Sequence, residues 1–250
     1  VVKQLGAITP STAGSRAGVK GLGMPDFHSQ PAVYFGFFDD FLQGRGNLAY
    51  AQDDDLAQAT AINYGVWRTN VDGTDDTITL DNALVGGVLE ILHGTSDNEE
   101  THMTAINHPF AMDASSARQI WFECRMKTSD ISGTGFFAGL ASAGGDEETD
   151  GNDLEDSVGF YIVDGATATT GDDLKLLTSV GDLETSTDVD TAVEDDTFMT
   201  LSWHFDGTDV RAYVNGTQKG ITASTLPTDG TVLFPAIHAA AREGSANTIS

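Results

Sequence analysis

The sequence predicts an all-β protein in which two antiparallel sheets pack as a sandwich behind an extended N-terminal arm. Three observations predict this fold class: apolar and polar residues alternate through most segments after Val33, clusters of Gly, Asp, Thr and Ser separate those segments, and helical spacing is scarce. A period of two places successive side chains on opposite faces of a strand, and many short strands with turns between them are typical of a sandwich or barrel. No repeat at a fixed spacing argues for a solenoid or propeller.

Residues 1–32 are rich in Gly, Ser, Ala and Pro and show no sustained period, which predicts an extended arm before a single sandwich domain at residues 33–250. The arm is basic up to Asp26, whereas the whole chain has 38 acidic and 12 basic residues. Such an arm is suited to lie across an acidic neighbouring subunit, and a terminus without a partner is the alternative. The residues expected to make the contact are Lys3, Leu5, Ile8, Arg16, Lys20 and Leu22.

The clearest strands lie in the middle and at the end of the chain. Residues 119–127 alternate so that one face is apolar and the other is polar or charged. Residues 198–220 predict an antiparallel meander, because Asp206-Gly207 and Asn215-Gly216 are hairpin-turn dipeptides between alternating segments. Further strands are expected at residues 76–80, 86–92, 135–141, 157–163, 174–180 and 231–239.

Other segments differ in composition from the strands. Residues 53–62 and 112–118 have helical spacing over a turn or two, and residues 144–157 and 181–196 are acidic stretches that are expected to be loops. The single cysteine, Cys124, lies on the apolar face of its strand, so the sequence predicts a buried, unreactive thiol and no intramolecular disulfide. Stability must then come from packing or assembly.

The net charge of the chain and the absence of common enzyme motifs limit the functions that the sequence allows. A formal net charge of −26 repels nucleic acid and anionic lipid, and it favours solubility in salty water, such as that of a marine source. No apolar run approaches the ~20 residues of a membrane helix. No nucleophile elbow, phosphate loop or dinucleotide fingerprint occurs, and His102 and His108 lack the spacing of a zinc site, so hydrogen-bonded structural histidines are expected.

Five segments carry a family resemblance: residues 35–42, 121–127, 135–141, 158–165 and 201–218. Together they resemble the concanavalin A-like lectin and glucanase jelly roll, and more narrowly the variants that tailed bacteriophages encode as virion structural proteins. The resemblance covers residues 33–250 and implies two stacked antiparallel sheets whose last strand returns to pair with the first. Residues 246–250 look like the start of that strand, so either further residues complete it or another element completes the sheet edge.

The residues do not match the enzymatic branch of this family. The resemblance implies a catalytic Glu-x-Asp-x-x-Glu strand, whereas Glu148 and Asp150 are followed by Asp153 in a glycine-containing stretch. Asp39 and Asp40 are adjacent, so in a strand they point to opposite faces and do not flank one glycosidic bond; they are expected to cap a turn. No catalytic residue is assigned, and a polysaccharide hydrolase or lyase remains an alternative.

Two kinds of binding site stay open. Calcium is the one possible cofactor, because an acidic segment offers many oxygen ligands. The segment lacks the residue order of an EF-hand, and the alternative is a solvated acidic loop. The candidate calcium ligands are Asp146, Glu148, Asp150, Asp153 and Asp156. A carbohydrate ring could stack on Trp67 with the neighbouring Tyr64, or on Trp121, which points away from the apolar row of its strand; core packing explains these rings equally well.

These inferences together predict a non-enzymatic surface protein of a tailed-phage virion, a capsid decoration protein on the exterior of the particle. Its expected partners are the major capsid protein and copies of itself, bound through the arm, with the acidic sandwich exposed to water. The alternative is a carbohydrate-binding module of a phage fibre or of a secreted marine protein, with glycans as its partners.

Overall fold

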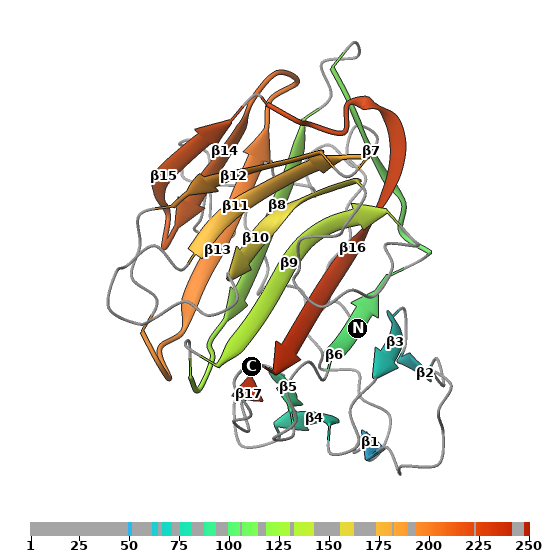
Figure 1. Ribbon diagram of the computed structural model, residues 1–250, viewed down its shortest axis with the longest axis vertical. Helices are drawn as coiled ribbons and strands as arrows, with labels where there is room; N and C mark the ends of the chain where they lie inside the picture. Colours follow the sequence, from blue (N-terminus) through green and yellow to red (C-terminus); the bar gives the residue numbers. More distant parts are fainter. Residues whose placement is uncertain are drawn as a thin grey trace, which may run out of the picture.

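The computed structural model describes the chain in ranges separated by gaps. These ranges are residues 50–51, 62–64, 67–71, 76–81, 88–93, 100–105, 107–114, 119–130, 133–142, 156–162, 174–181, 183–189, 194–222, 224–241 and 248–250. The regular elements within these ranges are all β-strands, which confirms the predicted all-β class (Figure 1). Within the same ranges, no helix is long and apolar enough to cross a membrane.

The larger layer is an antiparallel sheet that we call the nine-stranded sheet. Its order is β12-β11-β10-β9-β16-β6-β3-β2, with β7 beside β16. Its strands are β2 (Ile62–Tyr64), β3 (Trp67–Val71), β6 (Glu100–Thr104), β7 (Phe110–Asp113), β9 (Thr134–Ser142), β10 (Asp156–Ile162), β11 (Leu174–Val180), β12 (Leu183–Asp188) and β16 (Asp229–Ala241).

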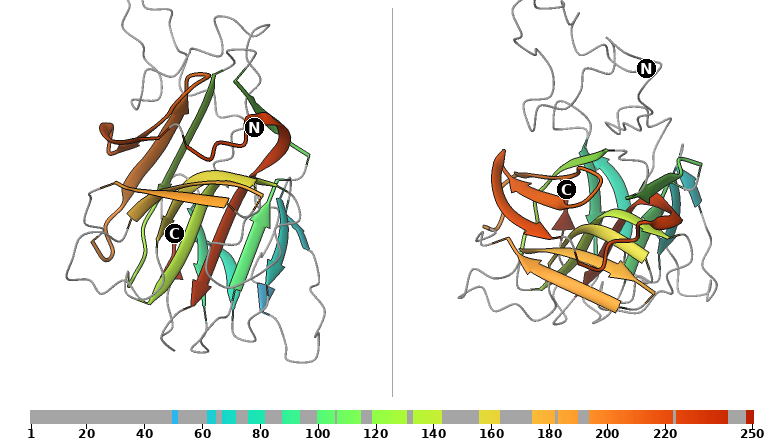
Figure 2. Two further views of the ribbon diagram at one scale, coloured as in Figure 1. Left: turned by 45° about the horizontal axis from the view of Figure 1, so that its top comes forward. Right: turned by 90° about the horizontal axis from the view of Figure 1, so that it is seen from above.

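Two four-stranded sheets form the opposite layer (Figure 2). The β8 sheet has the order β15-β14-β13-β8, and the β5 sheet has the order β1-β4-β5-β17. Their strands are β1 (Tyr50–Ala51), β4 (Thr77–Asp81), β5 (Val88–Leu92), β8 (Ile120–Met126), β13 (Met199–Phe205), β14 (Val210–Val214), β15 (Thr217–Thr222) and β17 (Thr248–Ile249).

The strand β17 joins the two smaller sheets. It pairs with β5 on one side, and on the other Ile249 bridges to Thr128, just after β8. Lys127 and Ser250 also exchange backbone hydrogen bonds of 2.7 and 2.9 Å. Thr248–Ile249 of the segment at residues 246–250 therefore forms a strand, and within the described ranges its neighbours are β5 and the end of β8.

One apolar cluster fills the space between the layers. It includes Phe136 and Phe160 from the nine-stranded sheet, Trp203 from β13 and Ile91 from β5. The ring of Phe122 on β8 stacks on Trp203 with 5.7 Å between centroids. The predicted alternation of β8 and β13 is confirmed, because one side-chain row of each strand lies in this core.

The centre of the nine-stranded sheet is also buried on its other face. Phe137, Tyr161 and Leu177 belong to a second apolar cluster on that face. Beside them Gly139 of β9 pairs directly with Gly159 of β10. A Cβ atom at Gly139 would collide with the backbone of β10, so this close approach of two strands requires glycine.

A buried polar contact connects the layers near β5. His93 Nδ1 lies 3.0 Å from Asp76 Oδ2, and both side chains are fully buried. The hydroxyl of Thr101, on β6, donates to the same carboxylate oxygen at 3.4 Å. This contact links the ends of β4 and β5 to the nine-stranded sheet.

Two expectations from the sequence are wrong at particular residues. Leu183–Asp188 forms β12 within the segment expected to be an acidic loop, and Met112 and Asp113 belong to β7 rather than to a helical turn. β12 is an edge strand in the described sheet, where Asp188 is exposed and backbone pairing with β11 supplies the stability. β7 is held by pairing with β16, which is distant in the sequence.

Replacing Gly139 tests the close approach of β9 and β10. We expect Gly139→Ala to lower the free energy of unfolding by about 3 kcal/mol or more, since the added methyl group meets backbone rather than a movable side chain. The control is Gly220→Ala, whose Cβ would lie 3.4 Å from Thr187 Cγ2, and it should cost less than about 1 kcal/mol. Urea denaturation measures both, and equal losses would contradict the assignment.

Candidate functional site

The outer face of the β8 sheet carries polar and aromatic side chains in register. These residues alternate with the core row of β8, β13 and β14, so they point away from the core. Strand pairing places them in two rows, one through Trp121 and one through Glu123. The six residues, which we call the outer-face residues, are Trp121, His204 and Arg211 in the first row and Glu123, Ser202 and Tyr213 in the second.

Tight turns at both ends of β14 set this register. Before β14, Asp206 Oδ1 accepts hydrogen bonds from the backbone nitrogens of Thr208 at 3.0 Å and Asp209 at 2.9 Å. After β14, Asn215 and Gly216 have φ angles of 50° and 78°, as a two-residue type I′ hairpin turn requires. Both turns that the sequence predicts are confirmed, and they align the outer-face residues of β13 and β14.

The rings of Trp121 and His204 are the centre of the first row. Their centroids are 3.7 Å apart and their planes differ by 16°, so the rings stack closely across the two strands. His204 is 8% exposed. Desolvation lowers the pKa of His204 below its ordinary value and nearby Arg211 lowers it further, while Asp206 acts in the opposite direction. The imidazole is therefore neutral at neutral pH.

Four polar atoms of the outer face are buried without a hydrogen-bond partner in the described part of the chain. They are Trp121 Nε1, Glu123 Oε2, Ser202 Oγ and His204 Nε2. A buried polar atom that lacks a partner costs about 1–3 kcal/mol, so the free protein leaves unused hydrogen-bonding capacity here. The indole offers a donor and the carboxylate an acceptor, and the hydroxyl and the neutral imidazole offer either.

Burial also sets the protonation of neighbouring groups on β8. Desolvation raises the pKa of Glu123 above its ordinary value. It raises the pKa of the Cys124 thiol, on the core side of the strand, to about 12, with a further contribution from the Glu123 charge. Cys124 is thus a protonated thiol, in agreement with the unreactive cysteine that the sequence predicts.

Basic residues surround the outer face and are held by specific contacts. Arg211 pairs with Asp206 at 2.5 Å and with Asp209 at 3.6 Å. The Arg125 guanidinium lies 4.2 Å from the centroid of the Phe198 ring, which is a cation-π distance. These contacts fix Arg211, one of the outer-face residues, and Arg125, which follows Glu123 by two residues on β8.

The aromatic residues predicted to bind carbohydrate separate in the structure. Trp121 lies on the outer face, as its place in the alternation predicts. Trp67 is only 4% exposed and belongs to the core, so its ring offers no stacking surface. Tyr64 lies on β2, opposite Trp67 in the strand register. Of the two tryptophans, Trp121 therefore lies on an outer face and Trp67 in the core.

The predicted calcium ligands fall almost entirely outside the described residues. The first four candidates, at positions 146, 148, 150 and 153, lie there, and so does the arm at residues 1–32. Asp156 begins β10, and its Oδ1 accepts a hydrogen bond from the backbone nitrogen of Gly181 at 3.3 Å. Among described residues, no group of three or more His, Cys, Asp or Glu side chains could hold a metal ion.

Two histidines of the nine-stranded sheet, His102 and His238, contact each other. His102 Nε2 lies 2.9 Å from Glu100 Oε2, and its ring contacts His238 edge-on with 4.4 Å between centroids. Burial and the nearby His102 hold the pKa of His238 well below its usual range. The hydrogen bond of His102 agrees with the structural role expected for it.

The fold is that of the concanavalin A-like lectins and glucanases, a jelly-roll sandwich with antiparallel sheets. No family model and no curated protein sequence matches the chain. Among solved structures, the carbohydrate recognition domain of Emp47p aligns with a TM-score of 0.51 at 11% identity, over 76% of this chain and 87% of that chain. At this identity the likeness shows the fold alone.

Two further structures align more weakly. A protein of unknown function from Shewanella oneidensis MR-1 has a TM-score of 0.46 at 14% identity and covers 93% of each chain. The carbohydrate-binding module CBM66 from Bacillus subtilis has a TM-score of 0.43 at 11% identity, over 72% of this chain and 94% of that chain.

The lowered pKa of His204 predicts a pH dependence of stability. A depressed pKa means that the unfolded chain takes up the proton more readily, so stability is present above the ordinary value of 6.5 and is lost as the pH falls below it. We expect wild-type protein to lose more stability than His204→Gln between about pH 7.5 and pH 5, by urea denaturation. His238 is present in both proteins, so the difference isolates His204. Parallel pH curves would contradict the prediction.

Proposed function

We propose that the protein is a non-enzymatic, lectin-like binding protein that recognises a carbohydrate at the outer face of β8, β13 and β14. The observation that carries this proposal is the set of four buried, unpartnered polar atoms on Trp121, Glu123, Ser202 and His204. A sugar hydroxyl both donates and accepts hydrogen bonds, so neighbouring hydroxyls can satisfy donors and acceptors together.

The desolvation of this face favours such a ligand. The four atoms have almost no solvent-accessible area, so we propose that the half-buried side chains beside them move aside when a ligand hydroxyl bonds to these atoms. Trp121, Glu123, Arg211 and Tyr213 are half-buried, and their exposed parts form the entrance to the site. The likeness to the carbohydrate recognition domain of Emp47p agrees with the proposal at the level of fold.

The charged groups support binding rather than hydrolysis. A glycosidase uses two carboxyl groups placed about 5 to 9.5 Å apart across the bond that is cleaved. Glu123 is the carboxyl group among the six outer-face residues, and the nearby Asp206 and Asp209 are engaged by Arg211. We therefore propose that the site binds carbohydrate without cleaving it, and turnover of any polysaccharide by the purified protein would count against this part of the proposal.

Trp121→Ala tests the carbohydrate site. On a glycan array and then by calorimetry, we expect the wild-type protein to bind a saccharide and Trp121→Ala to lose about 2 kcal/mol, or roughly 30-fold in affinity. Lys175→Gln is the matched control, because Lys175 lies on the nine-stranded sheet and pairs with Asp188. Binding that survives Trp121→Ala, or that falls equally in the control, would place the site elsewhere.

A second candidate concerns where the protein acts. The basic residues Lys3, Arg16 and Lys20 precede a body that gives the chain a net charge of −26. This asymmetry supports attachment of the arm to an acidic neighbour, and hence decoration of a tailed-phage capsid through the major capsid protein and further copies of this chain. The two candidates are compatible, since residues 1–32 would attach the protein and the sandwich would bind the ligand.

Deletion of residues 1–32 tests the decoration role. We expect the truncated protein to keep its far-ultraviolet circular dichroism and its glycan binding but to lose sedimentation with purified particles, at least tenfold, because many modest contacts act together. Mass spectrometry of gradient-purified particles should count wild-type protein in a simple ratio to the coat protein. Unchanged sedimentation without the arm, or absence of the protein from particles, would reject this role.

A further inference from the structure

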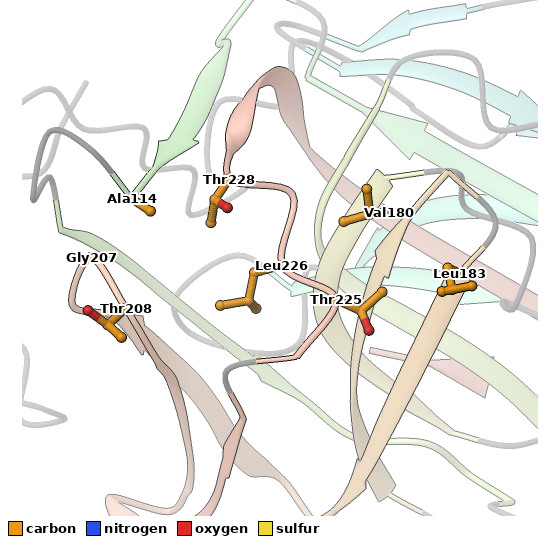
Figure 3. Close-up of a pocket in the computed structure, with 8 residues that line it drawn as sticks. All are labelled: Ala114, Val180, Leu183, Gly207, Thr208, Thr225, Leu226 and Thr228. Carbon is orange, nitrogen blue, oxygen red and sulfur yellow. The ribbon is translucent and has the colours of Figure 1, made fainter.

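A hollow opens at one end of the sandwich, where three connections meet (Figure 3). The β11–β12 connection, the β13–β14 turn and the segment between β15 and β16 contribute its walls, together with Ala114 after β7. The volume is about 680 Å³, within the ~300–1,000 Å³ of small-molecule sites. Its lining residues are Ala114, Val180, Leu183, Gly207, Thr208, Thr225, Leu226 and Thr228.

The lining has aliphatic groups and hydroxyls but no charged or aromatic side chain among the described residues. Leu226 lies in the middle of the hollow, between Thr208 on one side and Thr225 on the other (Figure 3). The nearest carboxylate of the turn, Asp206, is occupied by two backbone nitrogens and by Arg211. A neutral ligand that presents both hydroxyls and C–H surface fits this chemistry, and an ion does not.

The wall formed by residues 224–228 is held in a strained conformation. Thr225 is β-branched and has a φ of 51°, in the left-handed region that such residues avoid. Its hydroxyl lies 2.5 Å from the hydroxyl of Thr185 on β12, and the hydroxyl of Thr178 on β11 donates to the carbonyl of Ser224 at 3.0 Å. These contacts hold the backbone of Thr225 in that conformation and fix this wall of the hollow.

The β13–β14 turn connects residues of the outer face with residues that line the hollow. His204 and Arg211 occupy the row nearest this turn, and Gly207 and Thr208 within the turn line the hollow. Thr208 follows His204 by four residues, so their Cα atoms lie at most ~14 Å apart. A ligand that contacts both has to be longer than one sugar unit and to pass over this turn.

Resting on the carbohydrate-binding function proposed above, we infer that the hollow is a second subsite, which takes a neutral sugar unit of the same chain. The ligand is then an uncharged oligosaccharide rather than a monosaccharide. The outer face binds one unit through hydrogen bonds and the Trp121 ring, and the hollow binds a further unit through threonine hydroxyls and aliphatic contacts.

Calorimetry with neutral gluco-, manno- and galacto-oligosaccharides, from monosaccharide to hexasaccharide, tests this inference. For the wild type we expect affinity to rise with chain length by about tenfold, as the second subsite becomes occupied. Ala114→Trp fills the hollow from an exposed position and should abolish that rise without changing monosaccharide binding. Thr208→Val keeps the side-chain shape, removes one hydroxyl and should reduce the rise in part.

The outcomes separate the two sites. Trp121→Ala should weaken saccharides of every length, whereas Ala114→Trp should weaken only the longer ones. If Trp121→Ala loses binding but Ala114→Trp keeps the full rise with length, the hollow is not a subsite and the outer-face function stands. If no saccharide of any length binds to the wild type, both the proposed function and the subsite are overturned.

Discussion

The pairing of β8 with β13 is the constraint on which both the core and the candidate site depend. In its register, Phe122 and Trp203 meet on the inner side and Trp121 and His204 meet on the outer side. Because side chains alternate with a period of two, a slip of one residue on one strand would exchange its inner and outer rows. Burial of the apolar inner row stabilises this register strongly. The same core packing therefore positions the outer row, and contacts within the site are not needed to hold it in place.

Much of the fold follows from local pattern, and the errors occur where local pattern carries little information. The strands β8, β9, β11, β13 and β14 were predictable, because one or both of their faces are apolar and tight turns bound several of them. β12 was not predictable, because an edge strand needs no apolar face and its acidic composition resembles a loop. β7 depends on pairing with a strand far along the chain, which no local window contains.

The candidate site was predictable only in part, for the same physical reason. The alternation of residues 119–127 places Trp121 away from the core, and the structure confirms this position. Trp67 has no such pattern around it, and packing determines that it is buried. Ser202 and His204 could be assigned to the polar face of their own strand, but their meeting with Trp121 and Glu123 depends on long-range pairing. The signal that would have found them is the presence of polar residues opposite an apolar row on two separate predicted strands.

The charges on and near the outer face determine which kind of ligand can bind there. The net charge of −26 repels anionic polymers at long range. Near the site, Arg211 is paired with Asp206 and Asp209 and Lys127 with Asp196, and Arg125 lies over the Phe198 ring. What remains open on the face is hydrogen-bonding capacity on neutral or desolvated groups. Hydrogen bonds of this kind discriminate between ligands by geometry and are little screened by salt. A neutral, hydroxyl-rich ligand is therefore the partner that a strongly acidic protein can bind at this face without opposing its own charge.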